Sequence, residues 1–257
     1  MPLSDITIAI TSFLRFGYLA ECLRQAKEHL PECRIVVADD SGTPPPVPDD
    51  AGLISLPWDS GLTKKRNAIV RAATTPYVLL YCDDFATDAD ARAGVEKLLS
   101  VLENPAYPVD VAGGRVDNQS YEGFLEYVKG SHIKETRLVL NGGSDLYNVG
   151  LPGCFKVDLT VNYFLARTDV LREVPWDEEI APIGGEHVQE FLDLKQAGKT
   201  VVWVPGANVN TLRLGAGADV QDPRYGGFRR RAYSMGHTIM KKKYSIQRYV
   251  GFDGDVS

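Results

Sequence analysis

A short apolar run that ends in two adjacent carboxylates constrains the fold of this chain more than any other feature. Residues 77–82 are mostly apolar or aromatic, and Asp83 and Asp84 follow them directly. Such a run predicts a buried strand, and open α/β sheets bind ligands where their strands end. Two carboxylates at that edge favour Mg²⁺ or Mn²⁺, which take oxygen ligands and often bridge to substrate phosphates. The alternative is that both residues cap the next helix.

The residues before this run predict a parallel sheet. Residues 5–12 alternate β-branched and small side chains, residues 18–29 have apolar side chains at helical spacing, and residues 34–38 are a second apolar run. A strand, a helix and a strand in this order almost always form a right-handed unit with parallel strands. Residues 53–56 predict a weak third strand. We therefore expect a single α/β domain, for which 257 residues are sufficient.

A basic helix is expected over residues 61–73, with Lys64, Lys65 and Arg66 in its first turns. Free N–H groups at a helix N-terminus and nearby cations together form an anion site. We expect Arg66 to contact a ligand, because it lies just before the apolar ridge of this helix. A solvated basic face is the alternative, and for a single lysine it is the favoured one.

The composition excludes several classes of protein. A net charge of −6 argues against a broad nucleic-acid-binding face, although residues 229–231 and 241–243 are local basic clusters. No apolar run approaches the roughly 20 residues that span a bilayer, and residues 1–5 lack a basic segment ahead of an apolar core. The sequence therefore predicts a cytoplasmic protein. Four cysteines without Cys-x-x-Cys spacing predict neither a zinc site nor a disulfide framework.

The rest of the chain is less regular. A helix is expected over residues 87–104, and residues 117–155 indicate a hairpin-rich insertion. Residues 156–165 alternate as one strand, and residues 200–205 predict another. Residues 208–223 are rich in glycine and polar side chains, and we expect them to form a flexible loop.

Short motifs along the chain resemble one known family. They are Ile-Ala-Ile-Thr-Ser-Phe (8–13), Val-Val-Ala-Asp-Asp-Ser-Gly (36–42), Gly-Leu-Thr-Lys-Lys-Arg-Asn (61–67) and Tyr-Val-Leu-Leu-Tyr-Cys-Asp-Asp-Phe (77–85). Their order resembles the nucleotide-sugar-binding half of GT-A glycosyltransferases, especially glycosyltransferase family 2. Residues 183–191, Ile-Gly-Gly-Glu-His-Val-Gln-Glu-Phe, resemble the acceptor-side motif of β-1,4-galactosyl- and N-acetylgalactosaminyltransferases. The resemblance implies a GT-A fold in a single domain.

The resemblance also implies roles for the donor-side residues. Thr11 is expected to contact the nucleotide. Asp39 or Asp40 is expected to contact the nucleobase or ribose, and Arg66 is expected to reach the uracil or the diphosphate. Asp83 would lie near the ribose or sugar, and Asp84 would hold the metal that bridges the two phosphates. His237 is a positional candidate for a further metal ligand. Cys82 departs from the family, because an acidic residue is usual at that position.

The acceptor side depends on Glu186 and His187. Glu186 follows two glycines just before a helix expected over residues 188–197. An inverting transferase needs one base to deprotonate the attacking hydroxyl, so a single well-placed carboxylate is sufficient. Glu186 is the candidate, and His187 is the rival base. The alternatives are a helix cap for Glu186 and a packed or solvated side chain for His187.

The chain is therefore predicted to be a metal-dependent, inverting glycosyltransferase that uses a UDP-sugar and a glycan, lipid-linked or small-molecule acceptor. Its expected parts are a nucleotide-sugar-binding half (1–115), an acceptor-side half (116–223) and a basic C-terminal tail (224–257). One alternative is a nucleotidyltransferase or sugar-phosphate enzyme on a similar scaffold. Another is a non-catalytic carbohydrate- or nucleotide-binding module. Transfer onto a modified nucleic-acid base is a less favoured variant, because the chain is acidic overall.

Overall fold

The computed structural model describes residues 2–117, 119, 121–139, 153–180, 185–214 and 225–255, without the side chains of residues 226–234 and 255. Its elements follow one another in this order: η1 (Leu3–Asp5), β1 (Ile6–Ser12), α1 (Phe16–His29), β2 (Arg34–Asp39), β3 (Gly52–Ser55), α2 (Leu62–Ala72), β4 (Tyr77–Cys82), β5 (Phe85–Ala86), α3 (Ala89–Leu102), β6 (Val111–Val116), β7 (Gly123–Val128), β8 (His132–Arg137), β9 (Phe155–Val157), β10 (Phe164–Arg167), α4 (Thr168–Glu173), α5 (Glu186–Gln196), β11 (Val201–Thr211), α6 (Tyr225–Lys243), β12 (Arg248–Gly251) and β13 (Gly254–Asp255).

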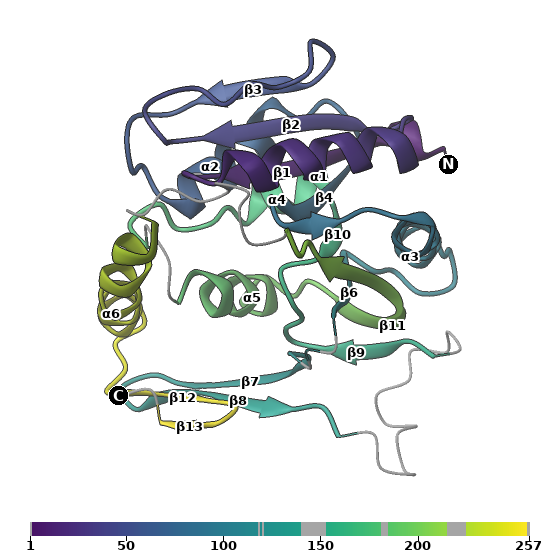
Figure 1. Ribbon diagram of the computed structural model, residues 1–257. Helices are drawn as coiled ribbons and strands as arrows, with labels where there is room; N and C mark the ends of the chain where they lie inside the picture. Colours follow the sequence, from purple (N-terminus) through teal and green to yellow (C-terminus); the bar gives the residue numbers. More distant parts are fainter. Residues whose placement is uncertain are drawn as a thin grey trace.

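A nine-stranded sheet runs through the molecule (Figure 1). Its strand order is β3-β2-β1-β4-β10-β6-β11-β5, and β9 pairs with β11 beside that path. Strands β1 to β4 are parallel to one another, as the sequence predicts. β10 is antiparallel to both of its neighbours, β4 and β6, so residues from the second half of the chain complete the sheet begun by the first half.

Helices cover both faces of this sheet, because the strands alternate their side chains between two cores. On β1, Ile8 and Ile10 belong to the core that contains Leu23 of α1 and Leu98 of α3. Ala9, between them, belongs to the core that contains Ile69 of α2 and apolar side chains of α4 and α5. The β1 pattern that predicted a strand is therefore the pattern of a strand buried on both faces.

A second, four-stranded sheet has the order β13-β12-β8-β7. β7 and β8 form an antiparallel hairpin, and β12 is parallel to β8. Residues 225–255 are thus a helix and two strands that complete this sheet. α5 lies between the two sheets (Figure 1), since Phe191 contacts Phe164 of β10 and Lys195 Nζ donates to the carbonyl oxygen of Leu125 in β7.

Two predictions about the second half of the chain are corrected. Residues 156–165 are not one strand, because β9 pairs with β11 while β10 inserts between β4 and β6. β11 extends to Thr211, so residues 208–211 are strand, and residues 215–223 of the expected loop lie outside the described residues. Residues 123–137 form a hairpin inside the expected hairpin-rich insertion at 117–155, of which residues 118, 120 and 140–152 lie outside the described residues.

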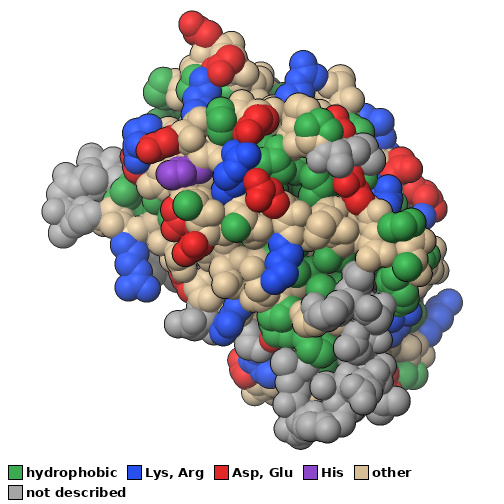
Figure 2. All heavy atoms as spheres, turned by 90° about the vertical axis from the view of Figure 1, so that its right-hand side faces the viewer, with side chains coloured by type: hydrophobic (Ala, Val, Ile, Leu, Met, Phe, Trp, Pro, Cys, Tyr) green, Lys and Arg blue, Asp and Glu red, His purple; other side chains and the backbone are tan. Residues whose placement is uncertain are grey.

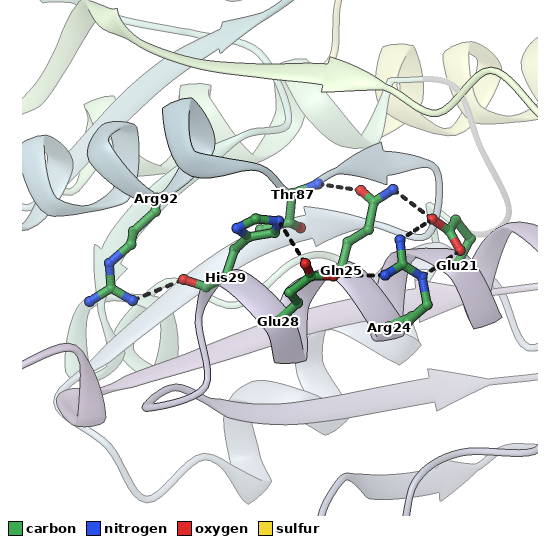
Figure 3. Close-up of polar contacts among 7 residues, drawn as sticks. All are labelled: Glu21, Arg24, Gln25, Glu28, His29, Thr87 and Arg92. Atoms are coloured by element: carbon green, nitrogen blue, oxygen red, sulfur yellow. Dashed lines mark hydrogen bonds and ion pairs between the residues drawn. The ribbon is translucent and has the colours of Figure 1, made fainter.

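Polar contacts tie α1 to the segment that follows the two carboxylates (Figure 3). The Oε1 atom of Gln25 accepts a hydrogen bond of 2.8 Å from the backbone N–H of Thr87. Arg92 Nη1 donates to the carbonyl oxygen of His29 at 2.9 Å. These contacts hold the start of α3 against α1. In the sequence, Asp83 and Asp84 lie between the end of β4 and Thr87, so the chain is fixed on both sides of them. No helix in the described residues is long and apolar enough to cross a membrane.

Candidate active site

The carboxyl ends of three strands meet at one edge of the main sheet. Ser12 at the end of β1 is opposite Asp39 at the end of β2, and Thr11 is opposite Cys82 at the end of β4. Asp83 and Asp84 follow Cys82 directly. The parallel register therefore brings the predicted donor-side residues of three separate segments to the same edge.

Arg15, which the sequence analysis missed, binds both carboxylates of the pair. Its Nη1 atom lies 3.0 Å from Asp83 Oδ1, and its Nη2 atom lies 2.7 Å from Asp84 Oδ2. Neither Asp83 nor Asp84 caps the next helix, because Asp88 accepts the hydrogen bond from Ala91 N–H at 2.8 Å. Arg15 lies in the loop after β1, which reaches the same sheet edge, and this position is the only signal in the sequence for its role.

The two carboxylates have different surroundings. The side chain of Asp83 is 6% exposed and that of Asp84 is 27% exposed. Burial raises the pKa of Asp83 to about 7, an effect that the charge of Asp84 increases and the charge of Arg15 opposes. Burial also raises the pKa of Cys82 to about 12, so its thiol is neutral near pH 7. Asp84 is therefore the group of this cluster that faces solvent as a hard oxygen ligand.

Asp39 and Asp40 are buried and bonded within the chain. Asp39 accepts hydrogen bonds of 2.9 Å from both the backbone N–H and the hydroxyl of Ser41. Asp40 accepts from Lys65 Nζ at 2.5 Å and from Gly61 N–H at 2.9 Å. Both carboxylates therefore stabilise the loops at the sheet edge. Their contact with a nucleotide stays a prediction. Burial raises the pKa of Asp39, against the hydrogen bonds from Ser41.

Arg66 lies between the end of β4 and the start of α5. Arg66 is only 3% exposed, and its guanidinium carbon is 5.4 Å from the ring centre of Trp176. Burial lowers the pKa of Arg66. Its charge interacts with Glu186, Cys82 and Glu190, in that order of size. The Nε and Nη1 atoms have no hydrogen-bond partner among the described residues. Arg66 is thus the described residue that links the carboxylate-bearing strand to the Gly-Gly-Glu segment.

Glu186 is the first residue of α5, directly after Gly185. Gly185 has a φ of +89°, a backbone conformation that favours glycine, and a Cβ there would lie 3.4 Å from the carbonyl oxygen of Gly236 in α6. The turn therefore packs closely on α6. His237, on α6, stacks on Tyr249 with ring centres 5.3 Å apart, and its charge interacts with that of Glu186. Burial lowers the pKa of His237.

His187 is packed between aromatic rings. The ring centres of Tyr121 and Phe191 are each 5.0 Å from that of His187, and its Nδ1 atom lies 2.7 Å from Asn162 Oδ1. Burial, with the charge of Arg66, lowers the pKa of His187 to about 3. The imidazole is therefore neutral near pH 7 and a weak base, which favours Glu186 of the two predicted bases.

Comparison with known proteins decides the family. Residues 7–149 match the family model for glycosyl transferase family 2, which covers more than half of the chain. The chain belongs to this family. The match includes all of β1 except Ile6, the elements from there to β8, and every predicted donor-side residue from Thr11 to Asp84. It ends before Glu186.

Individual proteins resemble the family 2 chain over most of its length. Human beta-1,4 N-acetylgalactosaminyltransferase 1 is 33% identical over 221 residues, which are 84% of this chain and 38% of the relative. Mouse beta-1,4 N-acetylgalactosaminyltransferase 2 is 33% identical over 192 residues, which are 73% of this chain and 36% of the relative. The chain thus spans little more than a third of the length of these curated relatives.

Solved structures confirm the predicted GT-A fold. A crystal structure of GalNAc-T7 with UDP, GalNAc and Mn²⁺ superposes with a TM-score of 0.58 at 12% identity, covering 82% of this chain and 44% of the other. TarS residues 1–349 from S. aureus superpose with a TM-score of 0.51 at 14% identity, covering 80% of this chain and 60% of the other. At such identities the likeness establishes the fold alone.

The family 2 fold and the residues present fit a divalent cation at Asp83 and Asp84. The pair already binds a cationic guanidinium, and its donors are the hard oxygens that Mg²⁺ and Mn²⁺ prefer. His237 interacts with Glu186 and stacks on Tyr249, and its role as a further metal ligand stays a prediction. Within the described parts of the chain, no three His, Cys, Asp or Glu side chains are grouped closely enough to hold a metal ion.

Proposed function

We propose that this chain is an inverting glycosyltransferase that moves a sugar from a UDP-sugar to an acceptor hydroxyl and depends on Mn²⁺ or Mg²⁺. The observation that carries the proposal is the Asp83–Asp84 pair at the sheet edge, inside the segment that matches family 2. Similarity to β-1,4 N-acetylgalactosaminyltransferases makes UDP-N-acetylgalactosamine the first donor to test. A cytoplasmic location belongs to the same proposal and rests on the sequence.

The residues divide the reaction between two sides. Glu186 takes the proton of the acceptor hydroxyl as its oxygen attacks the anomeric carbon. The bond between that carbon and the diphosphate oxygen breaks, and UDP leaves with the electron pair. Asp84, with Asp83, would hold the divalent ion, and that ion would supply positive charge that stabilises the departing diphosphate. Arg66 lies between the two sides and adds positive charge near both.

The acceptor is proposed to be a glycan, a lipid-linked sugar or a small molecule. A nucleic-acid acceptor is less favoured, because the net charge is −6 and acidic and basic side chains are interspersed on the face shown in Figure 2. Of the predicted basic clusters, Lys243 forms ion pairs of 3.1 Å with Asp177 and Asp193. The side chains of residues 229–231 lie outside the described set.

Calorimetric titration of UDP and a panel of UDP-sugars, with Mn²⁺, with Mg²⁺ and with chelator, tests the donor site. We expect Mn²⁺-dependent binding in the wild type and its loss in Asp84→Asn. Asp50→Asn, which changes an exposed carboxylate paired with Lys27, is the matched control and should bind as the wild type does. If no UDP compound binds with either metal, the proposal is wrong. Nucleoside triphosphates would then test the nucleotidyltransferase alternative.

Transfer itself is tested at Glu186. Glu186→Gln should still bind UDP and metal but should lose at least about a hundredfold in turnover, the usual contribution of a general base. His187→Asn should lose much less. Donor binding without any transfer in the wild type, across the acceptor classes above, would favour the non-catalytic binding module.

A further inference from the structure

We propose that Arg15 and the divalent metal compete for Asp83 and Asp84, and that the displaced Arg15 binds the diphosphate of the nucleotide. This inference rests on the proposed function and adds a residue to its donor site. It makes metal binding and nucleotide binding cooperative, because the nucleotide provides the anion that Arg15 needs once it leaves the carboxylates.

The first observation is that Arg15 holds both carboxylates at once. One arm of its guanidinium lies 3.0 Å from Asp83 and the other lies 2.7 Å from Asp84. This fork engages Oδ1 of Asp83 and Oδ2 of Asp84, so a metal ion at the pair has to share the two carboxylates with a bound cation. The charge of Arg15 also repels a divalent cation that binds to the same carboxylates. Arg15 and the metal ion therefore compete for the two carboxylates.

The second observation is that Arg15 has further partners that do not depend on the carboxylates. Its guanidinium carbon lies 4.7 Å from the ring centre of Tyr18 and 5.4 Å from that of Tyr225. Aromatic faces stabilise a guanidinium without neutralising it. Arg15 can therefore leave one or both carboxylates and remain a cation at the same sheet edge.

The third observation concerns the backbone that carries Arg15. The preceding residue, Leu14, has a φ of +57°, and its N–H donates to the hydroxyl of Ser41 at 2.8 Å. Ser41 is held in turn by Asp39. The base of the side chain is thus anchored to the ends of β1 and β2, at the sheet edge where open α/β sheets bind ligands. Only the guanidinium has to move for Arg15 to exchange a carboxylate for a phosphate.

Electron paramagnetic resonance of free Mn²⁺ tests the competition without any turnover. The titration uses the wild type, Arg15→Gln and Arg15→Met, each with and without UDP. Both variants remove the charge, and methionine retains an apolar stem between the two tyrosines. Without UDP, we expect both variants to bind Mn²⁺ at least about tenfold more tightly than the wild type. UDP should increase the Mn²⁺ affinity of the wild type. In both variants this increase should be at least about tenfold smaller, because they lack the residue that couples the two sites.

Two controls complete the experiment. Arg15→Lys keeps the charge and should bind Mn²⁺ alone about as the wild type does. Arg24→Gln changes an exposed arginine of α1 that pairs with Glu21 and Glu28 (Figure 3), and it should match the wild type throughout. Far-UV circular dichroism identifies a variant that fails to fold, and the competition is then decided by the remaining uncharged variant and Arg15→Lys.

Unchanged or weaker binding of Mn²⁺ alone in a folded uncharged variant would overturn the inference. If UDP increased the Mn²⁺ affinity of that variant as much as it does in the wild type, the proposed contact of Arg15 with the diphosphate would be wrong. Failure of the proposed function looks different, because the wild type would then bind no UDP compound with either metal. The measurement with Mn²⁺ alone still reports on the competition in that case.

Discussion

The Nζ atom of Lys65 lies 2.5 Å from Asp40 Oδ1, and both side chains are buried beneath the edge of the main sheet. Lys65 also donates to the carbonyl oxygen of Ser12 at 2.9 Å, so one cation joins the ends of β1 and β2 to α2. The helix that was expected to present an anion site therefore uses this lysine internally. Such a pair supports the loops of the site from beneath the sheet edge.

Breaking this pair should destabilise the protein strongly. Lys65→Met leaves the Asp40 carboxylate buried without its cation, and the loss of one partner of a buried ion pair costs about 3–5 kcal/mol. The free energy of unfolding in urea measures the effect. Asp50→Asn, which breaks the exposed pair with Lys27, should change it little. Equal effects of the two substitutions would show that burial adds nothing to the Lys65–Asp40 pair.

Ser41→Ala should loosen the loop that carries Arg15. The substitution removes the acceptor of the buried Leu14 N–H, and an unsatisfied buried donor costs about 1–3 kcal/mol. The free energy of unfolding and the rate of hydrogen exchange at Leu14 measure the loss. Ser100→Ala, which removes an exposed hydroxyl on α3, is the control. Wild-type exchange at Leu14 in Ser41→Ala would contradict this role.

His187 should make the protein less stable as the pH falls. Its pKa is about 3 in the folded state, and an unfolded histidine has a pKa near 6.5. Below pH 6.5 the unfolded chain therefore binds a proton that the folded protein does not, and stability falls by about 1.4 kcal/mol per pH unit until the folded pKa is reached. Between pH 6.5 and pH 5 this group alone removes about 2 kcal/mol.

The comparison of wild type with His187→Asn over this pH range isolates that contribution. The variant should lack it, so its free energy of unfolding should change less with pH than that of the wild type. Identical pH dependence in both proteins would mean that His187 titrates normally in the fold. The packed environment between Tyr121 and Phe191 would then be more open to water than the structure indicates.

Gly113→Ala should destabilise the centre of the sheet. A Cβ at Gly113 of β6 would lie 2.2 Å from the side chain of Thr160, so the substitution forces a shift in a packed core. Overpacking of this kind typically costs about 1–3 kcal/mol. Gly52→Ala on the edge strand β3 is the control, because its added Cβ would meet neighbours no closer than 3.5 Å. The midpoints of urea unfolding compare the two variants.

The sequence predicted the first half of the chain well, because the signals there are local. The apolar runs of β1, β2 and β4 and the helical spacing of α1 and α3 each lie within a dozen or so residues. It failed at residues 156–165 and 208–211, where the same alternation fits several strand arrangements. Which strand pairs with which is decided by contacts between distant segments, such as β10 with β4.

The candidate site divides in the same way. The sequence by itself determined that Asp83 and Asp84 end a buried strand and that Glu186 lies at the start of a helix or just before it, because strand and helix patterns depend on near neighbours. The tertiary structure alone decided that Arg15 binds a carboxylate 69 residues away and that Lys65 is buried against Asp40. It also placed His237 beside Glu186. Charges find these partners only after the sheet aligns its strand ends, so no local pattern encodes them.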